Sequence, residues 1–142
     1  MANGSRSKIL LVEDNRALRR LMSRILAGSE YAVLEAASGT EGLDLFREHL
    51  SSIDLAIIDM VLPGMSGLDV AAEIERHRPG MKILYISGHA ASVAMESIRQ
   101  RSPDRVLIKP FDAGELIDRV TRLLRPDQPQ PAPAGPPASA PG

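Results

Sequence analysis

The sequence has 142 residues, of which 44% are hydrophobic, and this suits one globular domain with a sizeable core. Its 17 basic and 18 acidic side chains give a net charge of -1, which argues against a dedicated nucleic-acid-binding protein. There is no cysteine, so disulfides, zinc–thiolate sites and thiol catalysis are excluded, and without an apolar leader or spanning segment we expect a cytoplasmic protein with no membrane partner.

The N-terminal part of the chain contains the first strand and helix pattern. Residues 1–7 are small and polar, and we expect them to be flexible. KILLV at 8–12 is typical of a buried strand, and Glu13 and Asp14 follow it directly. Apolar residues spaced three and four apart over 18–26 then predict an amphipathic helix.

Strand and helix patterns continue to alternate along the chain. Further strands are predicted at 32–36 (AVLEA), 55–59 (LAIID), 82–87 (KILYIS) and 105–109 (RVLIK), each followed by a helical pattern. Strict alternation of this kind predicts an α/β fold with a parallel sheet covered by helices on both faces. In such folds ligands bind beyond the carboxyl ends of the strands.

The last two helix patterns differ in strength. The segment 91–101 has a thin apolar stripe, whereas 116–124 has a regular one, preceded by a capping signal at Asp112 and Glu115. Residues 125–142 are rich in proline and alanine and cannot form a packed core. We therefore expect a folded domain over 8–124 and a disordered tail over 125–142.

Polar side chains follow four of the predicted strands. Their order along the chain is Glu13 and Asp14, then Asp59, Ser87 and Lys109. If these strands are neighbours, three carboxylates meet at one edge, where their repulsion requires a cation. Mg²⁺ prefers such oxygen ligands, and Asp59 is then placed to accept a phosphoryl group, with Lys109 and Ser87 contacting its oxygens.

Each of these residues also has a simpler interpretation when taken alone. Asp14 can cap a helix, and Asp59 can form an Asx turn before Pro63 and Gly64. Ser87 can belong to a turn, and Lys109 can be a solvated charge. The occurrence of all four at one predicted edge favours a functional site.

The motifs ILLVEDN, IIDMVLPGMSGLD, YISGH and LIKPF occur in an order and spacing that resemble the receiver domains of two-component response regulators. The resemblance covers residues 8–124. It implies a flavodoxin-like, doubly wound five-stranded sheet of order 2-1-3-4-5 with five helices, and a cis peptide between Lys109 and Pro110.

The same resemblance implies roles for individual residues. Asp59 would accept the phosphoryl group from the phosphohistidine of a histidine kinase or phosphotransfer protein. Mg²⁺ would be bound by Glu13, Asp14, Asp59 and the backbone carbonyl of Val61. A downstream protein would bind the face formed by the fourth helix, fifth strand and fifth helix, and no nucleic-acid partner is expected.

One position departs from the family pattern. Many receivers carry an aromatic switch residue three positions before the lysine, where this chain has Val106. Tyr85 either replaces that aromatic or is a core residue. The motifs YISGH and LIKPF are also similar to receivers attached to hybrid histidine kinases, so the chain is either part of such a kinase or a free-standing receiver in a phosphorelay.

Other functional classes fit the sequence less well. Phosphatases with an aspartate nucleophile carry the motif DxDx[TV] after their first strand. Asp59 follows the third predicted strand, and the sequence around it does not match that motif. A nucleotide-binding domain lacks its glycine-rich loop. A degenerate receiver that only binds a partner is a further alternative. We expect no enzyme activity beyond self-catalysed phosphorylation and autodephosphorylation.

Overall fold

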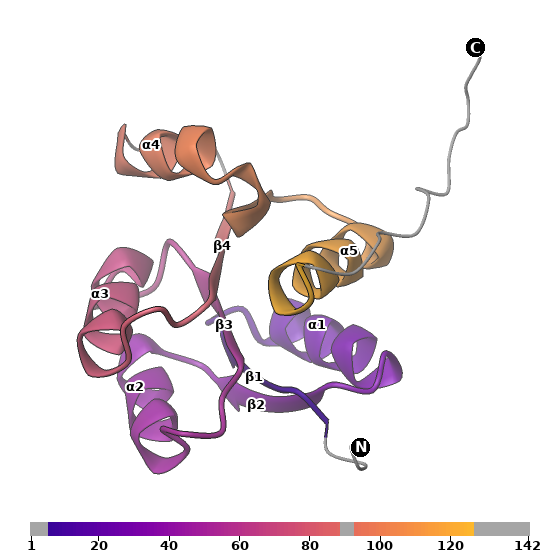
Figure 1. The fold of residues 1–142 in the computed structure, drawn as a ribbon, viewed down its shortest axis with the longest axis horizontal. Coiled ribbons are helices and arrows are strands. Elements are labelled where there is room, and N and C mark those ends of the chain that lie inside the picture. The colour runs from indigo at the N-terminus through magenta and orange to yellow at the C-terminus, as the bar shows by residue number, and fades with distance from the viewer. Residues whose placement is uncertain (1–5, 89–92, 127–142) are drawn as a thin grey trace.

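The computed structural model describes residues 6–88 and 93–126, and within them five strands alternate with five helices (Figure 1). The terminal residues 1–5 and 127–142, where most of the two predicted flexible segments fall, lie outside the described residues. In chain order the elements are β1 (Lys8–Val12), α1 (Arg16–Gly28), β2 (Ala32–Ala36), α2 (Gly39–Glu48), β3 (Leu55–Asp59), α3 (Gly67–His77), β4 (Ile83–Ser87), α4 (Val93–Arg101), η1 (Pro103–Arg105), β5 (Val106–Ile108) and α5 (Ala113–Leu124).

The strands form one parallel sheet of order β2-β1-β3-β4-β5, which confirms the predicted doubly wound fold. The strand β3 lies at the centre, and all five of its residues are buried. Its last residue, Asp59, pairs in register with Ile86 of β4. Ser87, which follows Ile86 on β4, pairs with Ile108 of β5. The polar residues that follow β1, β3, β4 and β5 therefore reach the same edge of the sheet.

Helices cover both faces of the sheet, with α1 and α5 on one side and α2 and α3 on the other (Figure 1). Alternate residues of each strand point to opposite faces, so the strands contribute to two separate cores. One core contains Val12, Phe46, Ile58 and Val70, and the other contains Leu11, Met22, Ile57 and Leu116.

Four helices begin with a side-chain cap, and these starts follow strands at the edge that carries the site. The caps are Asn15, Ser38, Ser66 and Asp112, each of which accepts a hydrogen bond from the backbone N–H three residues later. The predicted capping box of α5 is confirmed, because the Glu115 carboxylate also accepts from the backbone of Asp112. Each cap satisfies a backbone N–H at the start of its helix and stabilises that start by about 1 kcal/mol.

The last two strands are shorter than predicted, and β4 begins at Ile83 instead of Lys82. The predicted strand 105–109 is shorter, because Arg105 belongs to the 3-10 turn η1 and β5 spans only Val106–Ile108. The helix α4 spans Val93–Arg101, and residues 91 and 92 of the predicted segment lie outside the described residues. Among the described side chains of α4, Val93 is exposed and Met95 is buried. Figure 1 shows α4 at one end of the sheet, apart from α1 and α5.

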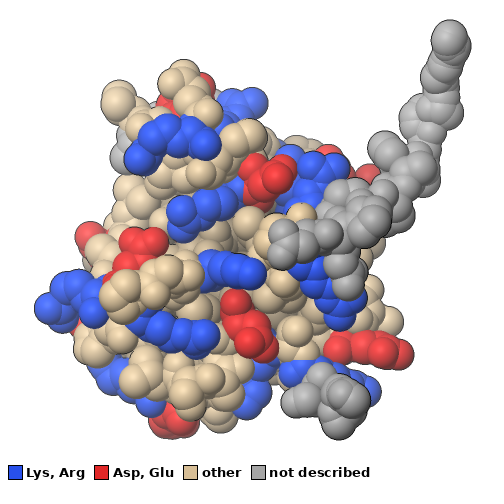
Figure 2. Space-filling model, in the orientation of Figure 1, with Lys and Arg blue, Asp and Glu red and all other residues tan. Residues whose placement is uncertain are grey.

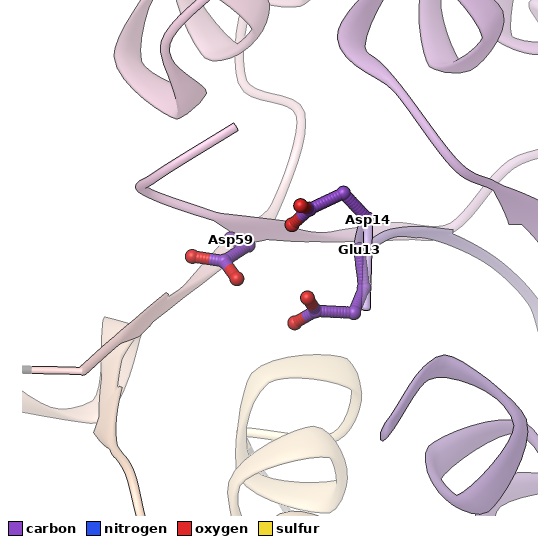
Figure 3. Close-up of side chains that lie close together, drawn as sticks. All are labelled: Glu13, Asp14 and Asp59. Atoms are coloured by element: carbon purple, nitrogen blue, oxygen red, sulfur yellow. The ribbon is translucent and has the colours of Figure 1, made fainter. Parts of the chain in front are cut away.

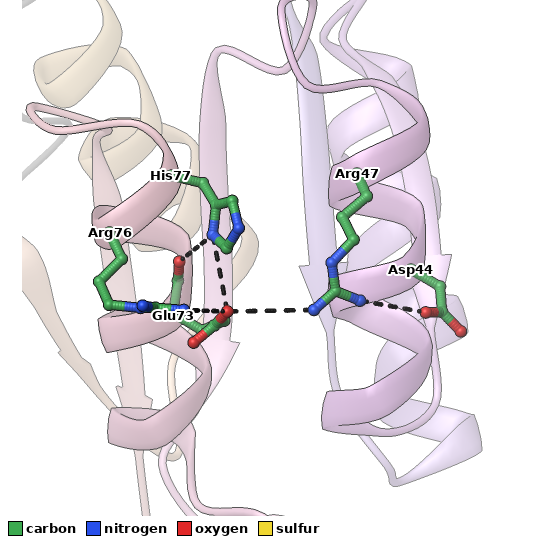
Figure 4. Close-up of polar contacts among 5 residues, drawn as sticks. All are labelled: Asp44, Arg47, Glu73, Arg76 and His77. Atoms are coloured by element: carbon green, nitrogen blue, oxygen red, sulfur yellow. Dashed lines mark hydrogen bonds and ion pairs between the residues drawn. The ribbon is translucent and has the colours of Figure 1, made fainter.

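Charged side chains on the helix surfaces are mostly paired with neighbours. Glu73 of α3 contacts Arg76 at 2.8 Å and His77 at 3.6 Å, and Arg47 of α2 approaches the same oxygen at 4.0 Å (Figure 4). The hydrogen bond from Arg76 is the main cause of the lowered pKa of Glu73. Basic and acidic residues are interspersed over the face drawn in Figure 2.

Candidate functional site at the carboxyl edge of the sheet

Three carboxylates lie together at the carboxyl edge of the sheet. Glu13 and Asp14 follow β1, Asp59 ends β3, and one oxygen from each lies within 4.8 Å of the others. Figure 3 shows the three side chains turned toward a common space. Glu13 and Asp59 are buried whereas Asp14 is exposed, so the cluster can be reached from solvent at Asp14.

Lys109, at the end of β5, supplies the counter-charge. Its Nζ donates a hydrogen bond to Asp59 Oδ2 at 2.9 Å and lies 3.5 Å from Glu13 Oε1. Partial burial opposes the charge on Lys109, but its hydrogen bond to Asp59 and the charges of Asp59 and Glu13 outweigh this and raise its pKa. One ammonium therefore faces two buried carboxylates, and the cluster as a whole has an excess of negative charge.

Glu13 shows the consequence of this excess. Burial is the largest cause that raises its pKa, to about 7, and the nearby Asp59 adds to the effect, while the backbone N–H of Asn15 and the charge of Lys109 oppose it. Glu13 Oε1 is buried and accepts no hydrogen bond from the described residues. A buried carboxylate oxygen without a hydrogen bond is costly, and a cation would satisfy it.

The donor set fits a hard divalent cation. All three ligand groups are carboxylates, and no cysteine is present in the chain. Mg²⁺ binds few carboxylates and keeps several waters, which the exposed side at Asp14 allows. Within residues 6–88 and 93–126, no second cluster of acids and histidines has ligand atoms at this spacing.

Asp59 is held at both oxygens and is only 3% exposed. Its Oδ1 accepts from the backbone N–H of Val61 at 2.9 Å, and its Oδ2 accepts from Lys109. The Asx-type turn and the charged site, which the sequence offered as alternatives, are therefore both present. Val61 lies beside the cluster, with its side chain exposed to solvent.

Ser87 and Lys109, the other residues predicted for the site, lie at the carboxyl ends of β4 and β5. Ser87 ends β4 and is 1% exposed, and the backbone N–H of Lys109 donates to its carbonyl at 2.8 Å. The peptide between Lys109 and Pro110 is cis, as the resemblance implied. Asp14 is not the cap of α1, because Asn15 takes that position.

Gly67 contributes to the site but was not identified from the sequence. It begins α3, and its backbone N–H donates to the carbonyl of Met60 at 3.1 Å. A Cβ at this position would lie 2.7 Å from Met60 Cα and would overlap the carbonyl oxygen of Asp59. Only glycine therefore lets α3 begin so close to Asp59, and its position eight residues after Asp59 gave no signal by itself.

A doubly wound parallel sheet with an acidic, metal-type pocket and a lysine at its carboxyl edge defines a class of α/β domains. Comparison with family models places the chain within it. Residues 9–121 match the model described as the response regulator receiver domain, and the chain belongs to this family. It is thus a receiver domain of two-component signalling, a non-enzymatic type of signalling module.

Individual relatives agree with this assignment. The chain is 33% identical over 116 residues to the sensor kinase CckA of Brucella abortus, covering 82% of the chain and 12% of that protein. It is 31% identical to the DNA-binding response regulator MtrA of Mycobacterium tuberculosis H37Rv, covering 89% of the chain and 54% of that protein. The chain therefore spans at most about half the length of these relatives.

A solved structure supports the same fold. The crystal structure of the receiver domain from the hybrid histidine kinase CckA superposes with a TM-score of 0.71 at 33% identity, covering 84% of this chain and all of that one. Receiver domains of this family bind Mg²⁺ at an acidic pocket and interact with histidine kinases and downstream effectors. No helix in the described part of this chain has the length and hydropathy needed to cross a membrane.

Proposed function

We propose that this receiver accepts a phosphoryl group on Asp59 from the phosphohistidine of a histidine kinase or phosphotransfer protein. The bond between phosphorus and the imidazole nitrogen breaks with its electron pair left on the imidazole, and a carboxylate oxygen of Asp59 forms the new bond to phosphorus. The observation that carries the proposal is the clustering of Glu13, Asp14 and Asp59 around one space, with Lys109 bonded to Asp59.

Each residue of the site has a defined part in this reaction. Glu13, Asp14, Asp59 and the backbone carbonyl of Val61 would hold Mg²⁺, which when bound would supply positive charge for the phosphoryl oxygens. Lys109 gives up its hydrogen bond to Asp59 and binds a phosphoryl oxygen instead. Ser87 donates its hydroxyl to another oxygen, and the same site later admits water for autodephosphorylation.

The phosphorylated site changes the affinity of the domain for a downstream protein at the face formed by α4, β5 and α5. This face adjoins the site through Ser87 and Lys109, which end β4 and precede α5. Val106 is buried and cannot rotate as an aromatic switch would, and Tyr85, its partner in register, is 4% exposed. Movement of α4 is therefore the main change that reports phosphorylation.

As a second candidate, the receiver domain is part of a longer histidine kinase. Similarity to CckA, a sensor kinase of which the chain covers 12%, favours a receiver that exchanges phosphoryl groups within or between kinase chains. A free-standing receiver would exchange them with a separate kinase. The chemistry at Asp59 is the same in both contexts.

Mass spectrometry after incubation with acetyl phosphate and Mg²⁺ tests the proposal. We expect the chain to gain one phosphoryl group, and we expect none in Asp59→Asn or in the presence of EDTA. Asp69→Asn is the matched control, because Asp69 is exposed on α3 outside the carboxylate cluster. A phosphoryl adduct on Asp59→Asn equal to that on the wild type would refute Asp59 as the acceptor.

A further inference from the structure

Asp14 is the exposed member of the carboxylate cluster, and its side chain has no direct support. Among the described residues, no hydrogen bond or ion pair holds its carboxylate. The direction of the Asp14 side chain therefore depends on the backbone that carries it. That backbone begins with the peptide that joins Glu13 to Asp14.

The peptide groups of Glu13 are fixed on both sides. The N–H of Glu13 donates to the carbonyl of Ala36, at the end of β2, at 3.0 Å. The carbonyl of Glu13 accepts a hydrogen bond from Arg19 Nη1 at 2.9 Å. This second bond comes from a side chain one turn into α1, which lies against β2 (Figure 1).

Arg19 is itself held in place. Its side chain is only 14% exposed, and its Nε lies 3.3 Å from Glu35 Oε1, which belongs to β2. The planar guanidinium can serve a carbonyl and a carboxylate at once, which an ammonium group cannot do in the same geometry. Arg19 thus connects β2, the start of α1 and the peptide before Asp14.

We propose that Arg19 is a positioning residue for the Mg²⁺ site, because it fixes the peptide that carries Asp14. The inference rests on the proposed function, in which Glu13 and Asp14 are metal ligands. Groups that orient metal ligands without touching the metal commonly change metal affinity by about tenfold or more. Arg19 contacts neither the carboxylate of Asp14 nor that of Asp59 in the described structure.

Positioning and charge predict opposite results for Arg19. Removing a positive charge near three carboxylates strengthens cation binding by Coulomb's law. Removing the support of the Asp14 backbone weakens it. The sign of the change in Mg²⁺ affinity therefore separates the two effects.

The test is a titration with MgCl₂, followed by the amide NMR signals of Asn15 and Val61, in the wild type and three variants. We expect Arg19→Gln to weaken Mg²⁺ binding about tenfold. Arg19→Lys keeps the charge, and we expect its Mg²⁺ affinity to lie between those of the wild type and Arg19→Gln. Arg20→Gln is the control, because Arg20 is exposed on the same helix, and it should leave the affinity unchanged or slightly higher.

A second readout needs no metal. In EDTA, the amides of Asp14 and Asn15 should exchange with solvent faster in Arg19→Gln than in the wild type, with the core amides of β3 unchanged. If Arg19→Gln does not fold, Arg19→Lys carries the comparison.

The possible results lead to different conclusions. Unchanged or tighter Mg²⁺ binding in both Arg19 variants overturns the positioning role and leaves the proposed function intact. A wild type that binds no Mg²⁺ overturns the proposed function and this inference with it. If Arg20→Gln weakens Mg²⁺ binding as much as Arg19→Gln does, the positioning role of Arg19 is also overturned. The loss of affinity would then not depend on the contact between Arg19 and Glu13.

Discussion

Glu13 should make the metal-free protein less stable at neutral pH than at acidic pH. Glu13 is 1% exposed, and its pKa is raised from 4.5 to about 7 in the folded protein, with burial as the largest cause. The folded state therefore holds this proton more tightly than the unfolded chain does. The contribution of Glu13 to stability consequently falls as the pH rises from about 4.5 to about 7 and stays low above that range.

Replacing Glu13 with glutamine tests this directly. The neutral amide resembles the protonated carboxyl and can still face Asp59. A pKa difference of one unit between the folded and unfolded states corresponds to about 1.4 kcal/mol of unfolding free energy. The rise in the pKa of Glu13 therefore corresponds to about 3 kcal/mol. We expect Glu13→Gln in EDTA to be more stable than the wild type by up to about this amount at pH 8.

Urea unfolding followed by circular dichroism, from pH 4 to pH 8.5 in EDTA, measures the effect. The stability difference between variant and wild type should be near zero at pH 4 and should grow between about pH 4.5 and about pH 7, above which it should stay constant. Glu48→Gln is the control, since Glu48 is exposed at the end of α2, and it should show no such growth. A Glu13→Gln variant less stable than the wild type at pH 8 would refute the reasoning.

Two further substitutions test other parts of the structure. Gly67→Ala should destabilise the protein by about 1–3 kcal/mol, because the added Cβ overlaps the backbone of Asp59 and Met60, whereas Gly28→Ala meets no atom within 4 Å and should be neutral or stabilising. Equal urea midpoints for the two variants would contradict the close packing at Gly67. Asp112→Ala removes the cap of α5 and should cost about 1 kcal/mol in thermal unfolding, and an unchanged melting temperature would show that the capping box is not needed.

The sequence predicted the sheet well because its strands are short, mostly apolar runs. Three of the five strands have the predicted bounds, and β4 begins one residue later than predicted. The strand β5 is one residue shorter at each end, at its start because Arg105 turns away into η1. There Arg105 Nε donates to the carbonyl of Ile83, and its guanidinium lies over the ring of Tyr85. These are contacts between distant residues, which a local pattern of apolar residues does not encode.

The site was only partly predictable for the same reason. The rule that ligands bind at the carboxyl edge indicated Glu13, Asp14, Asp59 and Lys109, because each directly follows or ends a strand. The sequence did not distinguish Glu13 from Asp14, although the first is buried and the second exposed. That difference arises where β1 ends and α1 begins.

Arg19 shows the limit of local patterns more clearly. It lies on a helix with several other arginines, and nothing in its spacing sets it apart from Arg20. Its distinction comes from its contacts with Glu13 and Glu35, which belong to two different segments of the chain. Such roles appear only when the tertiary structure brings the segments together.

The central position of β3 has a consequence for how the domain responds to chemistry. This strand is hydrogen-bonded on both sides and buried throughout, so its amides should be among the last to exchange with solvent. Asp59 is therefore attached to the most rigid part of the molecule. The proposed covalent change at its carboxylate would leave this anchor fixed, and we expect the displacement to fall on the loops after β3 and β5.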